Sequence, residues 1–498
     1  MKEFVSPFPE DQDTPEMREM LEKVEGAQET DLGKLKIKIV DMVCGGGKTS
    51  AAINLINNSP KEKKFLYITP YLTEVDRILK ECSGKHFIQP KSIDGKKING
   101  IEQLLDRGRN IVSTHALFLC FNSTIIELLK AQDYTLILDE VVDVARQVDE
   151  IKGNDLKYLL NYTIPGENGI LRWNQDKKYE GTWLSKYRNY IDLEALYYYK
   201  GTAILYLFPV KCFTAFKDIY VLTYMFDAQI QRCYYDFNNL EYDYYHVEST
   251  SVDKSDTTAY YFVEGKEPVE NREKFASLIN IITDKKLNEI GDNDSALSVT
   301  WYNKNRGTIL IRKLQNNTYN FFHNVAQTPS GLNLWTTFEK NRDALKGDGY
   351  KKSFLACNAR ATNEYLDRTS IAYLCNRYHD PILKGFFVTH SIEVKEDDWA
   401  LSELLQFIFR SAIRQEEKIM LYIPSSRMRR LLVDWLTEPE KHRRNVLYSQ
   451  IKQNVLTEMG VHSIEELTPE QIEECKNKIK QKLQEENLTV SNSTLLEE

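Results

Sequence analysis

A run of glycines followed by a lysine and a threonine, CGGGKT, is the segment of this sequence best suited to chemistry. Glycines let successive backbone N–H groups turn inward toward a phosphate, and the N-terminus of a following helix adds partial positive charge. Lys48 is predicted to reach the β- and γ-phosphates of a nucleotide, and the Thr49 hydroxyl to ligate Mg²⁺. The residues predicted to hold the nucleotide are Gly45, Gly46, Gly47, Lys48 and Thr49. The full phosphate-loop pattern has a glycine where this sequence has Met42, so the alternative is a strand–helix turn with an incidental lysine.

Two adjacent acids, Asp139 and Glu140, end the apolar run LILDE. An apolar strand that delivers two carboxylates to one sheet edge suits a ligand for magnesium-bound water, Asp139, and a general base for the attacking water, Glu140. Many buried strands end in acids, so the pair alone is equally compatible with a structural role. Its position after the phosphate loop, with strand–helix units between, favours the catalytic interpretation.

Three long polar side chains recur at intervals of four in QFIFRSAIR, namely Gln406, Arg410 and Arg414. If the segment is helical throughout, they lie near one face of the helix. An arginine supplied to a phosphoryl-transfer site is worth ~10³–10⁵ in rate. The alternative is a solvated basic face, because a stripe of leucine and isoleucine runs along the same segment.

The elements that must position these residues alternate between strand and helix patterns. Buried strands are predicted at 35–43, 65–70, 110–115, 134–140 and 219–226, and helical patterns follow the first three. This alternation predicts an α/β fold with a parallel, doubly wound sheet. A tyrosine-rich stretch at about 151–210 separates the last two strands and is interpreted as an insertion.

A second α/β pattern begins at about residue 265, with predicted strands at 296–302, 352–359, 369–376 and 418–425. The chain after Pro439 is charged, and LTPEQIEE has the start of a capped helix. The predicted organisation is an N-terminal extension at 1–34, a first domain at 35–230, a connector at 231–264, a second domain at 265–440 and a charged helical tail at 441–498.

The composition is that of a soluble globular protein, with 42% hydrophobic and 28% charged residues. The N-terminus lacks the apolar segment of a signal peptide and no run of ~18 apolar residues occurs, so a cytoplasmic location is expected, in a bacterium or a phage-infected host. The eight cysteines form no C-x-x-C, so neither a zinc ribbon nor a disulfide framework is expected. The net charge of −8 implies that any nucleic-acid channel is a local concentration of positive charge.

Together these segments resemble motifs I, II and VI of superfamily 2 helicases and translocases, most closely those of phages and mobile elements. Four further segments resemble motifs that lie between them: ITPY from Ile68 (Ia), VSTH from Val112 (Ib), LTY from Leu222 (III) and Arg360 to Asp367 (V). The resemblance implies two RecA-like domains with ATP and Mg²⁺ between them. It assigns nucleic-acid contacts to Thr69, Pro70, Ser113, Thr114, His115, Arg360, Thr362 and Asn363, nucleotide sensing to Asp367 and coupling to Thr223.

The sequence departs from the family pattern in three of these motifs. The acids are followed by two valines, so the motif is neither DEAD nor DEAH. Motif V lacks the common glycine before Asp367, and Arg414 follows Arg410 by four residues where the family spacing is three. Which of the two arginines contacts the γ-phosphate is therefore open.

The sequence thus predicts a nucleic-acid-dependent ATPase, a helicase or translocase that tracks a single strand, with DNA favoured over RNA. The alternative is an ATP-gated module that binds nucleic acid or protein with little turnover. No membrane contact is expected, and protein partners are expected through the insertion or the tail. In the insertion, Trp183, Tyr187 and Tyr190 are interpreted as packing residues, with stacking on bases as the alternative.

Overall fold

The computed structural model forms two compact units. The described residues are 37–177, 179, 183–251, 258–266, 272–358, 364–437, 451–452, 454–459, 461 and 467–485. The first unit comprises residues up to 267 with 358–363 and 377–409, and the second comprises 268–357, 364–376 and 410–498. The chain therefore leaves the second unit, returns to the first for α-helical segments, and then re-enters the second.

A seven-stranded sheet organises the first unit, in the order β12-β11-β1-β10-β4-β2-β3. Its strands are β1 (Ile37–Asp41), β2 (Lys64–Thr69), β3 (Ile111–Thr114), β4 (Tyr134–Asp139), β10 (Asp218–Thr223), β11 (Tyr242–Ser251) and β12 (Thr258–Glu264). All neighbours pair in parallel except β11 and β12, which are antiparallel. Because the chain runs outward from β1 to β2 and β3 and then returns through β4 and β10, the sheet is doubly wound, as the sequence predicts.

Short helices connect these strands. They are α2 (Lys48–Asn58), α3 (Leu72–Glu81), α4 (Lys97–Asp106), α5 (His115–Phe118), α6 (Ser123–Lys130), α9 (Lys211–Thr214) and α10 (Ile230–Phe237), with one-turn 3₁₀ helices η1 (Ser83–Lys85) and η4 (Phe226–Ala228). In α2 the small or branched residues Ala52, Ile53 and Ile56 are buried, whereas the polar Asn57 and Asn58 are exposed. This amphipathic pattern is what holds the helix against the sheet.

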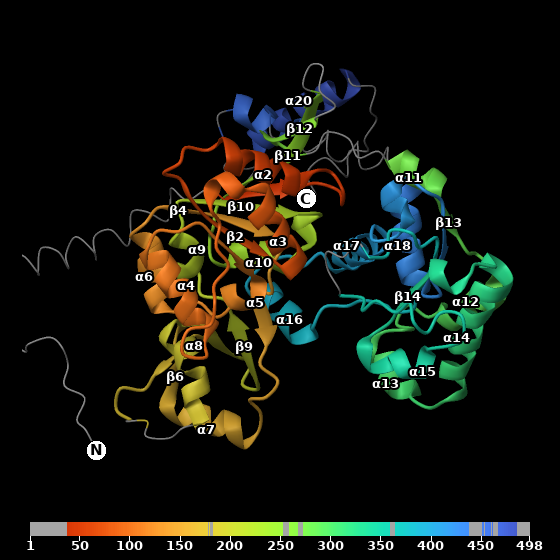
Figure 1. Ribbon diagram of the computed structural model, residues 1–498, viewed down its shortest axis with the longest axis horizontal. Coiled ribbons are helices and arrows are strands. Elements are labelled where there is room, and N and C mark those ends of the chain that lie inside the picture. The colour runs from red at the N-terminus through yellow and green to blue at the C-terminus, as the bar shows by residue number, and fades with distance from the viewer. Residues whose placement is uncertain are drawn as a thin grey trace, which may run out of the picture. The chain divides into compact units, whose positions relative to one another are not determined.

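The tyrosine-rich insertion forms a small lobe together with β5, the strand that precedes it. A three-stranded antiparallel sheet contains β5 (Ala145–Gln147), β9 (Ala203–Leu207) and β8 (Leu196–Tyr199), and a hairpin contains β6 (Thr163–Pro165) and β7 (Leu171–Trp173). The connecting helices are α7 (Asn154–Tyr162), η2 (Glu167–Gly169), η3 (Trp183–Tyr187) and α8 (Arg188–Asp192). Figure 1 shows α7 and β6 at one end of the first unit, with α2, β11 and β12 toward the other end.

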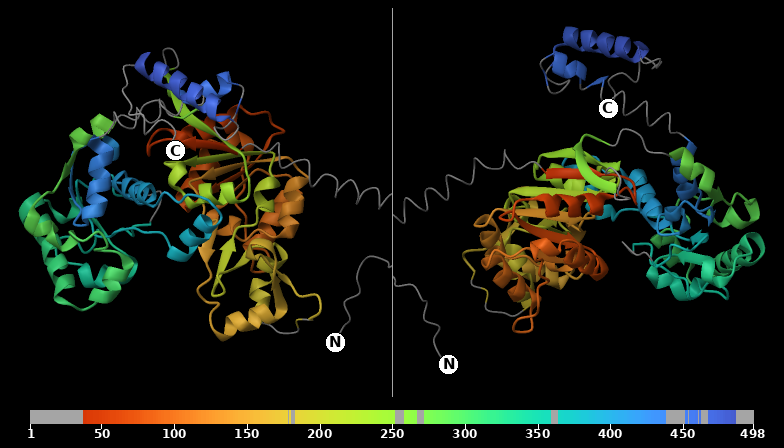
Figure 2. Two further views of the ribbon diagram at one scale, coloured as in Figure 1. Left: turned by 180° about the vertical axis from the view of Figure 1, so that it is seen from behind. Right: turned by 45° about the horizontal axis from the view of Figure 1, so that its top comes forward.

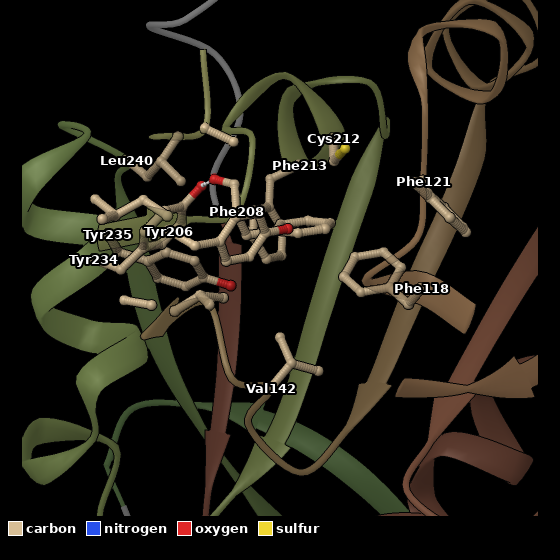
Figure 3. Close-up of a cluster of buried hydrophobic side chains, with 14 of the residues drawn as sticks. Phe118, Phe121, Val142, Tyr206, Phe208, Cys212, Phe213, Tyr234, Tyr235 and Leu240 are labelled. Carbon is tan, nitrogen blue, oxygen red and sulfur yellow. Dashed lines mark hydrogen bonds between the residues drawn. The ribbon is translucent and has the colours of Figure 1, made fainter. Parts of the chain in front are cut away.

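One aromatic core joins the insertion to the rest of the first unit. Phe118 of α5 packs on Phe208 and Phe213, with ring centroids 4.9 and 5.9 Å apart, and Phe213 packs on Tyr235 of α10 at 5.4 Å. Figure 3 shows these rings gathered between strands and helices from before and after the insertion. Tyr187 is also buried in this core, and Trp183 and Tyr190 pack against it, in keeping with the packing interpretation.

Residues 231–264, expected to form a connector, contribute α10 and two strands of the first unit's sheet. The alternating tyrosines of YDYYHV place aromatic side chains on both faces of β11. Further along the chain, α16 (Pro381–Thr389) and α17 (Glu396–Ile408) also belong to the first unit. Phe386 of α16 packs on Tyr197 and Phe237, so these helices share the aromatic core.

The second unit contains a four-stranded parallel sheet in the order β13-β16-β15-β14. Its strands are β13 (Ile279–Ile281), β14 (Asn333–Thr336), β15 (Ser370–Tyr373) and β16 (Ile419–Tyr422). Its helices include α11 (Arg272–Leu278), α12 (Lys285–Asn288), α13 (Val299–Asn305), α14 (Ile309–Asn320), α15 (Arg342–Leu345) and α18 (Ser426–Thr437), and a π-helical turn, η6 (Phe321–Ala326), follows α14. The predicted strands at 369–376 and 418–425 are confirmed as β15 and β16, and the predicted α/β fold class is confirmed by both sheets.

Two predicted strands of the second unit are wrong. ALSVTWY at 296–302 starts helix α13, because the Ser298 hydroxyl accepts a hydrogen bond from the Trp301 N–H (3.2 Å) and caps the helix. The segment 352–359 runs beside β14 through a single bridge at Phe354 and forms no strand in its described part. The other two strands of this sheet are β13 and β14, which the sequence pattern did not predict.

The predicted helical tail includes α20 (Pro469–Glu485). Thr468 and Gln471 form a reciprocal cap, in which the Thr468 N–H donates to the Gln471 side chain and the Gln471 N–H donates to the Thr468 hydroxyl. Figure 2 shows α20 with a shorter helical segment beside it, and Val455, Cys475 and Ile479 form their shared core. Within the described ranges no helix is long and apolar enough to cross a membrane.

Candidate functional site

The predicted phosphate loop connects β1 to α2. Gly45 and Gly47 have φ angles of 87° and 82°, in the left-handed region that favours glycine. The Gly46 N–H donates to the Val43 carbonyl (3.1 Å), and the Gly47 carbonyl accepts from Ala51 at the start of α2 (2.9 Å). The loop is therefore a tight turn leading directly into a helix N-terminus, the geometry in which free backbone N–H groups bind an anion.

The lysine of this loop turns back onto it. The Lys48 ammonium donates to the carbonyl oxygens of Met42 (2.6 Å) and Val43 (3.2 Å). Both partners are neutral, so an incoming phosphate offers the ammonium a stronger, charge-assisted partner at the same place. Met42, which stands where the phosphate-loop pattern has glycine, places its side chain beside Gly46, where an added Cβ would lie 2.8 Å from the Met42 sulfur.

The strand register brings the polar strand ends of the first unit to one edge of its sheet. Asp41 pairs with Thr223, Leu222 pairs with Asp139, and Thr69 pairs with Thr114. The carboxyl ends of parallel strands at a topological switch point are where α/β sheets bind ligands. The phosphate loop follows directly after Asp41, so the loop and these strand ends form one site.

The two predicted catalytic acids occupy different surroundings. Asp139 is buried, and burial together with the charges of Glu140 and Glu74 raises the pKa of its carboxyl to about 7. The Thr69 hydroxyl donates to the Asp139 carboxylate (3.2 Å) and partly offsets that rise. Glu140 has a φ of 66°, unusual for a residue with a side chain, and its Oε2 atom is buried without a hydrogen-bond partner among the described residues. Backbone strain of this kind is typical of functional sites.

This arrangement fits a divalent cation. A buried carboxylate whose ionisation is opposed by two neighbouring acids, Glu140 and Glu74, is stabilised when a cation binds. Thr49, in the first turn of α2, provides the hydroxyl oxygen that Mg²⁺ accepts as a ligand. Within the described residues no group of three or more His, Cys, Asp or Glu side chains could hold a metal ion by itself.

Asp41 is a site residue that the sequence interpretation missed. Its carboxylate accepts hydrogen bonds from the N–H groups of Met225 (2.7 Å) and Phe226 (2.9 Å), so it holds η4 at the end of β10. Burial raises the pKa of Asp41 to about 6, against the lowering effect of these two hydrogen bonds. An acid at the end of a strand just before the phosphate loop was the available signal, the same one that identified Asp139.

Helix α17 is connected to this edge through η4. Gln229, directly after η4, donates from its side chain to the Ser402 hydroxyl of α17 (3.0 Å). Gln406 lies one turn further along α17 and is buried, with its side-chain nitrogen unbonded among the described residues. Thr223, predicted to couple hydrolysis to movement, is fully buried at the end of β10. Its hydroxyl also has no hydrogen-bond partner among the described residues.

The expected helical face of Gln406, Arg410 and Arg414 is wrong in part. Helix α17 ends at Ile408, so only Gln406 lies on it. Arg410 is buried in the following turn, and Arg414 is exposed in the 3₁₀ helix η9 (Ala412–Gln415). Both arginines belong to the second unit, whereas Gln406 belongs to the first.

The residues assigned to nucleic acid fall in three places. Thr69 ends β2 and Pro70 follows it, and Ser113, Thr114 and His115 span the turn from β3 into α5. The His115 Nε2 atom lies 2.8 Å from the Asp139 backbone carbonyl oxygen, which connects this turn to the end of β4. Asp367 is exposed in a turn before β15 and pairs with its neighbour Arg368 (3.3 Å). Arg360, Thr362 and Asn363 lie outside the described residues.

The fold and the motifs of the first sheet define a class. A glycine loop, an Asp-Glu pair and a strand-end threonine occupy adjacent parallel strands of one α/β unit, and a second α/β unit with a parallel sheet follows. By fold the chain is a protein of two α/β units, and its first sheet carries the segments that resemble superfamily 2 helicase motifs.

Comparison with known proteins places the chain in a family. It is 39% identical over 419 residues to the SPbeta prophage-derived protein YonV of Bacillus subtilis strain 168, covering 80% of this chain and 98% of that protein. Residues 273–436 match the family model described as the YonV C-terminal Rossmann-like domain. The chain therefore belongs to the YonV family, and the prophage origin of this relative agrees with the predicted similarity to proteins of phages and mobile elements.

Solved structures of XPD proteins align over most of the chain, at low identity and low TM-score. An apo form of XPD aligns with 12% identity and a TM-score of 0.41, covering 81% of this chain and 95% of that one. Xpd4 of S. tokodaii aligns with 12% identity and a TM-score of 0.40, covering 83% and 97%.

Proposed function

We propose that this protein is a nucleic-acid-dependent ATPase, a helicase or translocase that tracks a single strand, with DNA favoured over RNA. The proposal rests on one observation. The phosphate loop, the Asp139–Glu140 pair and the strand-end threonines lie on one edge of a single sheet, in the register that parallel pairing imposes.

Each group at this edge has a chemical task in the proposed reaction. The loop N–H groups and the Lys48 ammonium hold the phosphates, and Lys48 exchanges its two carbonyl partners for phosphate oxygens. Thr49 and Asp139 would hold Mg²⁺, which neutralises charge on the phosphates when bound. Glu140 orients the attacking water and accepts its proton, a role worth ~10²–10⁴ in rate.

The tie between the loop and α17 provides a route by which hydrolysis moves other parts of the first unit. Asp41 fixes the N–H groups of η4, and Gln229 fixes Ser402 of α17. Because Asp41 precedes the phosphate loop directly, a change of loop conformation on phosphate binding alters the position of η4. Arg410 and Arg414 of the second unit are proposed to supply the transition-state charge.

Two substitutions test the proposed chemistry in the full chain. Lys48→Ala should abolish both ATP binding at micromolar concentrations and hydrolysis. Glu140→Gln should lower turnover by ~10²–10⁴ and leave ATP binding within a few-fold of wild type, because it removes the base and keeps the side chain's size. Hydrolysis by Glu140→Gln at the wild-type rate would contradict the assignment. Tight ATP binding with negligible turnover by the wild-type chain would favour the gated binding module.

A further inference from the structure

The strand order gives the phosphate loop two unequal sides. Asp139 and Glu140 end β4, which lies beyond β10 on one side of β1, whereas β11 and β12 lie on the other side. The terminal phosphate, where hydrolysis occurs, must face the two acids. The nucleoside end of the ligand therefore extends toward the β11–β12 hairpin.

The hairpin projects beyond the sheet on the side of the phosphate loop. Tyr245 of β11 is level with Val40, one residue before the end of β1. Ser249, four residues further along β11, pairs with Tyr260 of β12. At ~3.3 Å per residue, Tyr260 lies about 13 Å past the level of Val40, beyond the sheet edge.

Tyr260 contacts the loop itself. A Cβ added to Gly47 would lie 2.5 Å from Cδ1 and 2.7 Å from Cε1 of the Tyr260 ring, but 3.3 Å from Cγ. These distances place the Cβ over one face of the ring near its Cδ1–Cε1 bond, so Gly47 covers part of one face and the opposite face is turned away from Gly47. Gly47 precedes Lys48 at the mouth of the loop, so the ring stands beside the place where the phosphates bind.

The hairpin backbone at this point is fixed. The Asn54 side chain of α2 donates to the Tyr260 carbonyl (2.9 Å). Phe262, two residues along on the same face of β12, stacks on Tyr220 with ring centroids 5.5 Å apart. Tyr260 packs against the core between α2 and the sheet, makes no ring–ring contact with the described residues and is partly exposed. Its position is therefore set, while the ring face turned away from Gly47 stays available.

We propose that Tyr260 is the residue on which the base of the bound nucleoside triphosphate stacks. This assignment rests on the proposed function and adds to it a base-contacting side chain on an element far along the chain from the phosphate loop. Stacking uses the π-face that every base has, so Tyr260 contributes affinity for adenine and guanine alike and does not itself select between them.

The test measures equilibrium binding of two probes to the full-length chain. The first is imido-ATP, which resists hydrolysis, and the second is inorganic tripolyphosphate, which lacks a base. Tyr260→Ala should weaken imido-ATP binding by about 10-fold, since stacking is worth that order of affinity. Tripolyphosphate binding should change by less than about 2-fold. Tyr260→Phe keeps the ring and should bind both probes like wild type.

Tyr261→Ala is the matched control. Tyr261 is the adjacent tyrosine on the opposite face of the same strand, where its hydroxyl donates to Glu248 (3.1 Å). The Tyr261→Ala variant should bind both probes like wild type.

Three outcomes would overturn the assignment. Equal weakening of both probes by Tyr260→Ala would show that the ring only supports the loop. Unchanged or tighter imido-ATP binding would show that the ring does not contact the base. A wild-type chain that binds neither probe would overturn the proposed function itself, and the assignment with it.

Discussion

The two units share a parallel α/β architecture but differ in the chemistry of their strand ends. In the first unit the strand ends carry Asp41, Thr69, Asp139 and Thr223, and a glycine loop follows β1. In the second unit β15 ends at Tyr373 and continues into Leu374, whose carbonyl accepts hydrogen bonds from the Tyr302 and Thr337 hydroxyls. The first sheet edge thus carries acids and hydroxyls beside a glycine loop, whereas at the second the Leu374 carbonyl is bonded by side chains of its own unit.

The same contrast appears where the chain leaves the second sheet. Asn376 donates to the carbonyls of Asp294 and Ala296 and accepts from Arg427. Its polar atoms are thereby used within the fold, whereas Glu140 and Thr223 keep buried oxygen atoms without partners among the described residues. Thr336 at the end of β14 also has such a hydroxyl, so the difference between the two edges lies in the carboxylates of the first, which no strand end of the second sheet carries.

The largest expected effect concerns the contribution of the second unit to turnover. Arg410→Ala together with Arg414→Ala should lower strand-stimulated hydrolysis by at least ~10³, while ATP binding by the first unit's loop stays near wild type. Steady-state hydrolysis and equilibrium ATP binding measure the two effects. The single variants then decide which arginine acts.

Arg430→Ala, an exposed arginine of α18, is the control for charge alone and should hydrolyse ATP normally. If the double variant also hydrolysed ATP normally, the second unit would contribute no catalytic arginine from this segment.

A matched pair of threonines sharpens the comparison of the two sheet edges. Thr223 ends β10 and Thr336 ends β14, and both are fully buried with hydroxyls that lack partners among the described residues. Replacing either with valine keeps the shape, so both variants should unfold within ~1 kcal/mol of wild type. Only Thr223→Val should lower strand-stimulated hydrolysis, by about 10-fold. Equal activity of the two variants would remove the functional distinction between the edges.

The smallest expected effect is on stability. The pKa of the Asp139 carboxyl is about 7 in the folded chain and near 3.8 in the unfolded chain. Between these two pH values the folded state therefore holds a proton on Asp139 that the unfolded state has lost. The stabilising contribution of the protonated form is present below pH ~4 and is lost as pH rises through 7. Asp139→Asn removes this loss and should raise the melting temperature above that of wild type at pH 8 by several degrees, at ~2–4 °C per kcal/mol.

Thermal unfolding at pH 5 and pH 8 without nucleotide measures this effect, and the gain should be larger at pH 8. Adding Mg²⁺ should raise the wild-type melting temperature and leave the variant's unchanged. A variant that is less stable than wild type at pH 8 would mean that the ionised Asp139 carboxylate is well solvated or paired.

Local sequence signals predicted the strands and the loop that carry the first unit's candidate residues, because each of these residues stands next to a strong structural signal. The glycines before Lys48 require left-handed backbone, and the apolar run before Asp139 is long enough for a buried strand. Once the sheet is parallel, the register of the strand ends follows. Asp41 had the same signal but was passed over, because its partners, the N–H groups of Met225 and Phe226, lie far along the chain.

The second unit was harder to predict, since its elements are short and decided by tertiary contacts. Val299, Trp301 and Tyr302 have strand-forming side chains, yet the Ser298 cap and burial of Tyr302 against the sheet make the segment helical. The ending of α17 at Ile408 could not be read from a continuous apolar stripe either. Tyr260 was not predicted because its proximity to Gly47 depends on how far the hairpin extends past the sheet.

The measurement that tests the central claim most directly is ATP hydrolysis by the full chain alone and with single-stranded DNA, duplex DNA or single-stranded RNA. The account predicts that single-stranded DNA raises the rate by at least about 10-fold and that Lys48→Ala abolishes activity with every polymer. A rate that is the same with and without all three polymers, or one that persists in Lys48→Ala, would contradict a strand-dependent motor built on this sheet edge.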